Sequence, residues 1–405
     1  MVKKLRILGG ISLTRDLVLL LALGGLYSLS VALSNTFVNI YLWKQSGDFA
    51  EIGLYNLSIV ILQPITFFLA GRWAKKVDRI IVLRTGVIFL ALFYFSVLAA
   101  GTGASRMLMV LGGLLGIGYG FYWLAFNVLT FEITEPDTRD FFNGFLGILS
   151  SAGGMVGPIA SGFIITQIGG LKGYMAVFGL SLTLFSLAVV LSFFLKPRPS
   201  EGKYSFKEVL IERKRNQNWR FITNAHLFQG LREGTFVFVI SVYVFLSTGS
   251  ELSLGTFGLI NSGVSFVAYF AASRLIKKNR RKKAILLGGI ILYAAVFLIF
   301  KDVTFTKLLI YGATIAVAYP ILLVPYMSIT YDVIGGSWKA AEMRIEYIVV
   351  REIFLNTGRI ISILVFLAAV SLFDWHKSIP VVLLILGAGH SFIYFFVKKI
   401  HLSSP

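Results

Sequence analysis

The sequence has no cysteine, which excludes disulfide bonds and metal sites built on thiolates. Charged residues are also scarce: Asp, Glu, Lys and Arg make up 14% of the chain, against about 25% in soluble globular proteins. No Gly-Lys-Ser/Thr loop for phosphate binding occurs, so ATP is not the expected energy source. Four histidines and scattered acids form no evident metal cluster or catalytic set. We therefore expect no enzyme, no metal and no cofactor.

Hydrophobic residues are abundant, at 57% of the 405 residues, and the mean hydropathy is +0.81. The first apolar run is too long for the core of a signal peptide, so we interpret it as a retained helix. Twelve apolar segments approach the 20 or so residues that a helix needs to cross a bilayer. They lie at 17–43, 51–71, 80–101, 107–131, 142–166, 173–195, 221–247, 253–274, 283–300, 306–331, 344–372 and 379–397.

The net charge of +19 is unevenly placed, because most of the 38 Lys and Arg residues fall in every second loop. Basic loops stay on the cytoplasmic side of membrane proteins, so this pattern predicts that both termini are cytoplasmic. Topology alone explains these loops. Specific binding of RNA or anionic lipid is the less favoured alternative, and we expect no nucleic acid partner.

A polar stretch separates the first six apolar segments from the last six, and its residues 203–213 are typical of a short amphipathic helix on the membrane surface. The two halves also resemble each other at a spacing near 202, where 71–79 matches 273–281 in its Arg, Lys, Lys and final Arg. Parallel six-helix repeats are typical of transporters. The predicted division is 1–196 for one bundle, 197–219 for a central cytoplasmic loop and 220–405 for the other bundle.

Twelve helices, a central loop and basic loops after the second and eighth helices resemble the major facilitator superfamily. The resemblance implies an all-α membrane protein of two pseudo-symmetric six-helix bundles. It also implies gating loops on the cytoplasmic side, which would contain Gly71, Lys76, Arg79, Lys277, Lys278 and Arg281. One position departs from the family pattern: Lys75 stands where an aspartate is usual, with Asp78 nearby as a substitute. The gating role of this loop is therefore open.

The fifth helix is similar to the glycine-rich helix of antiporters in this superfamily. Its small residues predict close packing against a neighbouring helix, with a bend at the proline. The fourth helix departs from the proton antiporters, which carry an arginine shortly before a Gly-x-Gly: Arg106 lies at the outer end of the helix, away from Gly116-Ile-Gly118. Symport and antiport thus stay open. The packing motif consists of Gly144, Gly153, Gly157, Pro158 and Gly162.

Polar residues in the first half fall on helical stripes. Asn35 and Asn39 share one face of the first helix, and Trp123 and Asn127 lie four apart on the fourth. Such residues either face a cavity or bond to neighbouring helices. We expect them to form the first-half side of a binding pocket.

The second half contains ionisable residues inside its apolar segments, which is costly in a bilayer and typical of functional sites. His226, Gln229 and Glu233 share one helical stripe, with Arg232 beside them, and a second stripe lies on the eleventh helix. Glu233, Glu352 and His226 are the candidate proton sites. Three arginines against two glutamates leave one positive charge, for which we expect Arg359 to bind an anionic group. The candidate charge network comprises Arg232, Arg351, Arg359 and Asn356.

These patterns predict a proton-coupled secondary transporter that moves a small organic solute or drug by alternating access, with an anionic group as one option. We expect a monomer in the plasma or inner membrane, with import and export both open. Three alternatives remain. The arginine–glutamate pairs are purely structural, or the protein is a lipid or glycolipid flippase on the same fold, or it is a membrane sensor or scaffold without transport.

Overall fold

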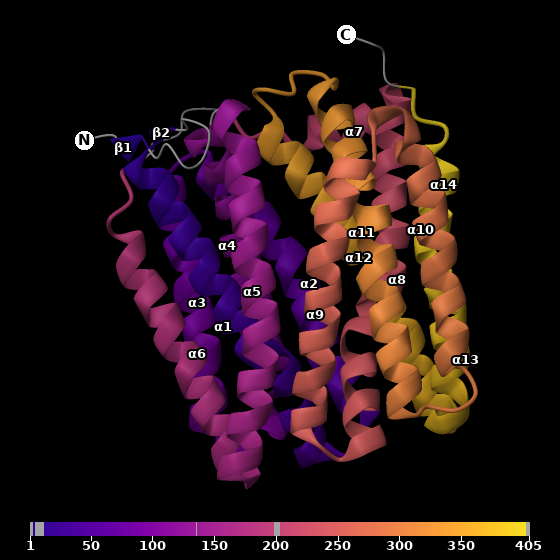
Figure 1. Cartoon of the computed structure of the whole chain (residues 1–405). Helices are drawn as coiled ribbons and strands as arrows, with labels where there is room; N and C mark the ends of the chain where they lie inside the picture. Colours follow the sequence, from indigo (N-terminus) through magenta and orange to yellow (C-terminus); the bar gives the residue numbers. More distant parts are fainter. Residues whose placement is uncertain (1–2, 5–11, 135, 198–202, 402–405) are drawn as a thin grey trace.

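The computed structural model describes residues 3–4, 12–134, 136–197 and 203–401, and most of this part is helical (Figure 1). The first half contains α1 (Arg15–Ser46), α2 (Phe49–Ala74), α3 (Arg79–Ala100), α4 (Leu108–Ile133), α5 (Pro136–Ile168) and α6 (Gly170–Ser192). The second half contains α8 (Gln217–Thr248), α9 (Glu251–Leu275), α10 (Arg281–Val296), α11 (Phe305–Gly335), α12 (Arg344–Leu372), α13 (Trp375–Gly387) and α14 (Gly389–Val397). The short elements are β1 (Lys3–Lys4), β2 (Ser12–Leu13), α7 (Phe206–Arg215), and the 3-10 turns η2 (Gly101–Met107), η3 (Lys278–Arg280) and η4 (Phe297–Ile299).

Eleven stretches of the described chain are long and apolar enough to cross a membrane. One of them, 79–130, contains both α3 and α4, which are joined by η2 and are each long enough for a crossing. The last crossing, Trp375–Val397, is formed by α13 and α14 together. The all-helical fold with twelve crossings is thus confirmed.

The two halves are built alike. Helices α1 and α8 have 32 residues each and begin 202 positions apart. Both end at a glycine in the left-handed region, Gly47 with φ of 64° and Gly249 with φ of 62°, where a side chain would be strained. The next helices then begin at matching caps, Asp48 and Ser250, whose side chains accept backbone N–H groups. The repeat predicted at this spacing is therefore present in the helix boundaries.

Glycines set the distances between helices within each bundle. A Cβ atom on Gly112 would lie 2.4 Å from the carbonyl oxygen of Tyr55, so α4 and α2 touch along their backbones. In the second half a Cβ on Gly230 would lie 2.0 Å from the carbonyl oxygen of Leu355, and Gly358 makes the reciprocal contact. Lipid is as apolar as leucine, so helices in a bilayer associate through such close packing.

The two bundles contact each other along two helix pairs. On one side α5 packs against α9, where Gly162 faces the backbone of Glu251 and Gly255 faces that of Pro158. On the other side α2 packs against α12, where Gly53 faces Leu367. These contacts surround the space between the bundles, which is where the candidate site lies.

The outer surface is apolar, as expected for helices in lipid. Val267, Leu275 and Leu372 are 64%, 72% and 74% exposed, which is unusual for such side chains in a water-soluble protein.

The central connection contains a helix, as predicted, and α7 is fixed to α8 by a hydrogen bond from the indole nitrogen of Trp219 to the carbonyl oxygen of Val209 (3.1 Å). Helix α1 begins and α14 ends at the same end of the molecule as α7 (Figure 1). That this end is cytoplasmic, and that the domains divide at 196 and 220, stay predictions.

Candidate functional site

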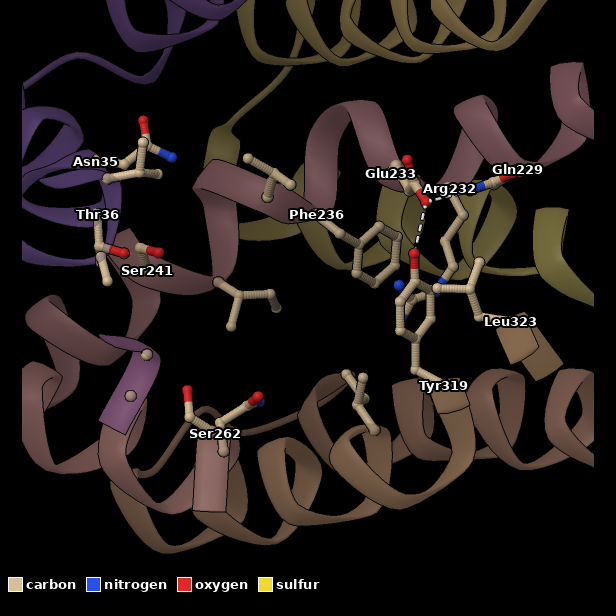
Figure 2. Close-up of a pocket in the computed structure, with 18 of the residues that line it drawn as sticks. Asn35, Thr36, Gln229, Arg232, Glu233, Phe236, Ser241, Ser262, Tyr319 and Leu323 are labelled. Atoms are coloured by element: carbon tan, nitrogen blue, oxygen red, sulfur yellow. Dashed lines mark hydrogen bonds between the residues drawn. The ribbon is translucent and has the colours of Figure 1, made fainter. Parts of the chain in front are cut away.

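A cavity of about 910 Å³ lies between the bundles, a volume typical of small-molecule sites. The first bundle contributes Asn35 and Thr36 of α1 and Trp123 of α4 to its wall. The second contributes polar side chains of α8, α9, α11 and α12. Figure 2 shows Glu233 of α8, Ser262 of α9 and Tyr319 of α11 among them. Residues far apart in the sequence thus face one space.

A second cavity of about 480 Å³ adjoins the first and lies toward α2. Its polar wall is formed mainly by the first bundle, through Asn39, Asn56, Gln63, Tyr119 and Asn127. Both cavities share Asn35, Trp123, Glu233, Arg351, Glu352 and Arg359. The charged residues therefore line both cavities.

The carboxylate of Glu233 accepts hydrogen bonds from three side chains of the site. Its Oε2 accepts a hydrogen bond from Nη2 of Arg359 at 2.6 Å, which links α8 to α12. Its Oε1 accepts from Nε2 of Gln229 at 2.8 Å and from the hydroxyl of Tyr319 at 3.0 Å (Figure 2). Three donors surround this carboxylate, so its charge is well compensated in the present arrangement.

The network extends in both directions from Glu233. Beyond Gln229, the imidazole of His226 lies 2.9 Å from the Gln229 amide oxygen and 3.3 Å from the hydroxyl of Thr330. Beyond Arg359, Nη1 donates to the amide oxygen of Asn356 at 3.3 Å. One chain of hydrogen bonds therefore joins α11, α8 and α12.

A second ion pair lies on α12 itself. Nη2 of Arg351 is 2.5 Å from Oε1 of Glu352, and both side chains are buried. The backbone carbonyl of Glu352 accepts from the amide of Asn356 at 3.0 Å. Burial of such a pair costs desolvation energy, which the close contact offsets only if the partners stay together.

Arg232 lies beside the network without joining it. Its closest hydrogen-bonding partner is the hydroxyl of Tyr311, at 3.5 Å, and its guanidinium group lies 4.5 Å from the ring centre of Phe236. Its Nε is buried without a partner, and no acid of the described chain lies within ion-pair distance of it.

This arrangement corrects the expectation that Arg359 is the arginine without a carboxylate. Consecutive residues leave a helix about 100° apart, so Glu233 faces α12 while Arg232 faces α11. Arg359 forms an ion pair with Glu233, and Arg351 forms one with Glu352. The positive charge that remains belongs to Arg232, and it lines the central cavity.

The polar residues of the first bundle bond to each other at the cavity wall. Nδ2 of Asn56 donates to Oδ1 of Asn39 at 2.9 Å, and the hydroxyl of Tyr119 donates to Oδ1 of Asn35 at 3.3 Å. Trp123 packs edge-on against Tyr27 at 5.1 Å between ring centres. This wall is neutral, in contrast to the charged wall opposite.

The sequence matches the family model described as Major Facilitator Superfamily over residues 20–343, which is most of the chain. The chain belongs to this superfamily. As a member of it, the protein is a multi-pass membrane transporter of the secondary type and not an enzyme.

Two similar proteins come from bacteria. "Uncharacterized protein YqgE" of Bacillus subtilis (strain 168) is 63% identical over 400 residues, which cover 99% of this chain and 93% of that protein. "Uncharacterized protein in sodM 3'region" of Geobacillus stearothermophilus is 58% identical over 198 residues, 49% of this chain and 92% of its own length.

Two solved superfamily structures share the fold at 16% identity. The human organic anion transporter MFSD10 (TETRAN) has a TM-score of 0.69, with 95% of this chain and 99% of that chain covered. The E. coli fucose:proton symporter FucP has a TM-score of 0.62, with 94% and 97% covered.

The glycine motif of this superfamily member lies where α5 meets two other helices. Gly153 and Gly157 face Leu29 and Ala32 of α1, and Gly162 faces α9. Pro158 contacts Gly258 of α9. Gly144 belongs to α5, but its surroundings lie outside the described residues. The motif thus contacts both bundles.

At the α7 end, the loop after α2 contains Lys75, the residue that departs from the superfamily pattern, and Lys75 contacts the other bundle. Nζ of Lys75 lies 3.3 Å from Oε1 of Glu346 and donates to the carbonyl oxygen of Glu342 at 2.8 Å, which joins α2 to α12 and its preceding turn. Gly71 lies one helical turn before Lys75 on α2, and a Cβ atom there would be 3.0 Å from the side chain of Val349.

The other predicted loop residues divide into paired and exposed ones. Arg79 pairs with Glu132 at 3.0 Å, and Arg281 pairs with Asp332 at 2.8 Å, each within its own bundle. Exposed side chains belong to Lys76, Lys277 and Lys278.

At the opposite end, a second contact joins the bundles. Lys44, at the end of α1, forms an ion pair with Glu251 at the start of α9, and the hydroxyl of Tyr174 donates to the same carboxylate at 2.9 Å. Ion pairs therefore join the bundles at both ends of the cavity.

Several residues of the site were not predicted. Tyr319 donates to Glu233, Tyr311 contacts Arg232, and the ring of buried His390 stacks on Tyr319 at 5.7 Å. Tyr311, Tyr319 and Tyr326 are eight and seven apart on α11, which is a helical stripe. Sorting the tenth apolar segment by helical phase would have identified these three tyrosines.

Proposed function

We propose that this protein is a proton-coupled secondary transporter of a small organic anion, which works by alternating access in the bacterial plasma membrane. The observation that carries the proposal is Arg232. It presents a buried guanidinium group to a ligand-sized cavity and has no carboxylate partner in the described chain. An unpaired cation in such a place is costly, and an anionic substrate would compensate it.

The pair of Glu233 and Arg359 supports proton coupling. Protonation of Glu233 would remove the charge that holds Arg359 at 2.6 Å and so weaken the contact of α8 with α12. Arg359 would then be free to turn toward a substrate in the cavity, which it also lines. Glu352 is a second proton site by the same reasoning, through its pair with Arg351.

Two transporters of this fold have names that state the proposed properties, one an organic anion transporter and one a fucose:proton symporter. The fold therefore accommodates both anion transport and proton coupling. At 16% identity this likeness supports the architecture, and the proposal for this chain rests on its own arginines and glutamates.

The two alternative functions fit the geometry less well. A flippase needs a lateral opening for a lipid headgroup, but in this state α5 is in backbone contact with α9, and α2 packs against side chains of α12. A scaffold without transport needs no central space, whereas about 910 Å³ is open and lined by polar groups.

A thermal-shift screen of the purified protein tests the substrate class. Organic carboxylates, phosphates and sulfonates are compared with amines and neutral sugars. We expect anions to raise the melting temperature, because a ligand at 100 times its Kd stabilises by about 2.7 kcal/mol. Arg232→Gln should abolish the shift, and Arg106→Gln, at an exposed arginine of η2, should retain it. Shifts with amines only would refute the anion assignment.

Flux in proteoliposomes tests the coupling with any anion that binds. Uptake driven by a pH gradient is compared in the wild type and in the Glu233→Gln, Glu352→Gln double variant. We expect the double variant to bind the anion but to lose the response of flux to the gradient. Flux that stays proton-dependent in this variant would exclude both glutamates as the coupling sites.

A further inference from the structure

A groove on the outside of the second bundle shares no residue with the central cavities. It has a volume of about 690 Å³ and lies where α9, α10 and α11 meet, at the same end of the molecule as α7. Its walls are apolar and include Ala271, Leu287 and Val317. Leu275 and Leu287 are 72% and 52% exposed, so the groove faces the lipid and not the protein interior.

The end of the groove that lies toward η3 is polar and positively charged. Asn279, Arg280 and Lys283 line it, and all three side chains are exposed. Among the described residues, no acid lies within ion-pair distance of Arg280 or Lys283, and neither side chain donates a hydrogen bond. Two cations and an amide thus stand together at the mouth of an apolar groove.

Neighbouring basic residues of the same segment behave differently. Arg281 pairs with Asp332 at 2.8 Å, and Lys282 donates to the carbonyl oxygens of Lys398 and Ile400 at 3.1 and 2.7 Å. These two hold the ends of the helices together. Lys277 and Lys278 of the same segment are exposed and also have no ion-pair partner in the described chain, but they do not line the groove. Arg280 and Lys283 are therefore the unpaired cations that an anion in the groove would meet.

We propose that this groove binds one anionic phospholipid. The phosphate lies between Arg280 and Lys283, with the Asn279 amide as a further donor, and an acyl chain lies along the alanine and leucine wall. Charge complementarity selects an anionic headgroup, since basic pockets between membrane helices bind such lipids. The apolar length of the groove selects a lipid over free phosphate, which would leave that wall unoccupied.

Native mass spectrometry of the detergent-purified protein tests the site by titration with phosphatidylglycerol or with phosphatidylcholine of the same acyl chains. We expect one phosphatidylglycerol to bind with clear preference over phosphatidylcholine. Arg280→Gln with Lys283→Gln should weaken that binding about 25-fold, since each surface cation contributes roughly fivefold. The matched control is Lys398→Gln with Lys399→Gln, at the same end but outside the groove, and it should retain the affinity.

A second variant keeps the test decisive if loss of both charges impairs folding. Ala271→Phe fills the wall without changing charge, and it should also weaken phosphatidylglycerol binding. Equal affinity for the two lipids, or affinity unchanged in both groove variants, would overturn the proposal. Inorganic phosphate that displaced the lipid at equal concentration would also overturn it, because the acyl chain would then contribute nothing.

Discussion

Lys75→Gln would remove the cation that joins the two bundles at the α7 end. The ammonium group of Lys75 lies 3.3 Å from Glu346, whose side chain is fully buried. The other contact of Oε1 of Glu346 is the backbone N–H of Ser205 at 3.1 Å, and Oε2 has no partner among the described residues. Without Lys75 the carboxylate would remain buried with a single neutral donor.

The burial of Glu346 sets the free-energy cost of losing Lys75. Loss of one partner of a buried ion pair costs about 3–5 kcal/mol, because the remaining charge is left uncompensated. The side chain of Lys75 is 9% exposed, so we expect the lower end of that range, about 3 kcal/mol. In an arrangement that opens at the α7 end, water would hydrate the Glu346 carboxylate, so its charge would no longer be buried without a partner. The population of the open arrangement should therefore rise by up to about 100-fold.

The absence of cysteine makes the measurement direct, since an introduced cysteine is the only thiol. Ser262→Cys places that thiol on the wall of the central cavity. Its rate of reaction with a membrane-impermeant maleimide is measured in right-side-out and inside-out vesicles. We expect Lys75→Gln to raise the rate at least tenfold from the α7 side only.

Three controls separate the ion pair from general damage. Lys76→Gln removes the same charge from an exposed neighbour and should change nothing, and Lys75→Arg should keep the cavity closed. Lys75→Gln with Glu346→Gln should recover much of the closed state, because no buried charge remains. A labelling rate in Lys75→Gln equal to that in Lys76→Gln would refute the reasoning.

Three further predictions concern the rest of the site. Gly230→Val should lower the melting temperature and abolish transport, because a Cβ there would lie 2.0 Å from a carbonyl oxygen of α12; Gly179→Val, with open space around it, is the control. Glu251→Gln should raise the labelling rate of the same cavity thiol from the side opposite α7, because the ammonium group on α1 loses its ion-pair partner. Arg359→Lys should reduce proton-coupled flux at least tenfold, because one ammonium group cannot replace a fork that contacts Glu233 and a neighbouring amide; an unchanged flux would contradict this.

Sequence reasoning predicted which ionisable residues line the central cavity better than it predicted how they pair. Glu233, Arg351, Glu352 and Arg359 were identifiable because ionised groups are rare in apolar segments. The surplus arginine was misassigned. Which of two adjacent side chains faces α12 depends on the rotation of α8, and close contact at Gly230 fixes that rotation.

The number of crossings, the internal repeat and the membership in a transporter fold were determined by the sequence. The reason is that apolar length, charge alternation and helical period are local properties of the chain. Other features depend on where helices distant in sequence approach each other. Only the tertiary structure decided that Lys75 has a partner on α12, that Arg232 is the cation left in the cavity, and that Arg280 and Lys283 line a groove toward lipid. These positions depend on how the helices pack at glycines, whose partners cannot be read from composition.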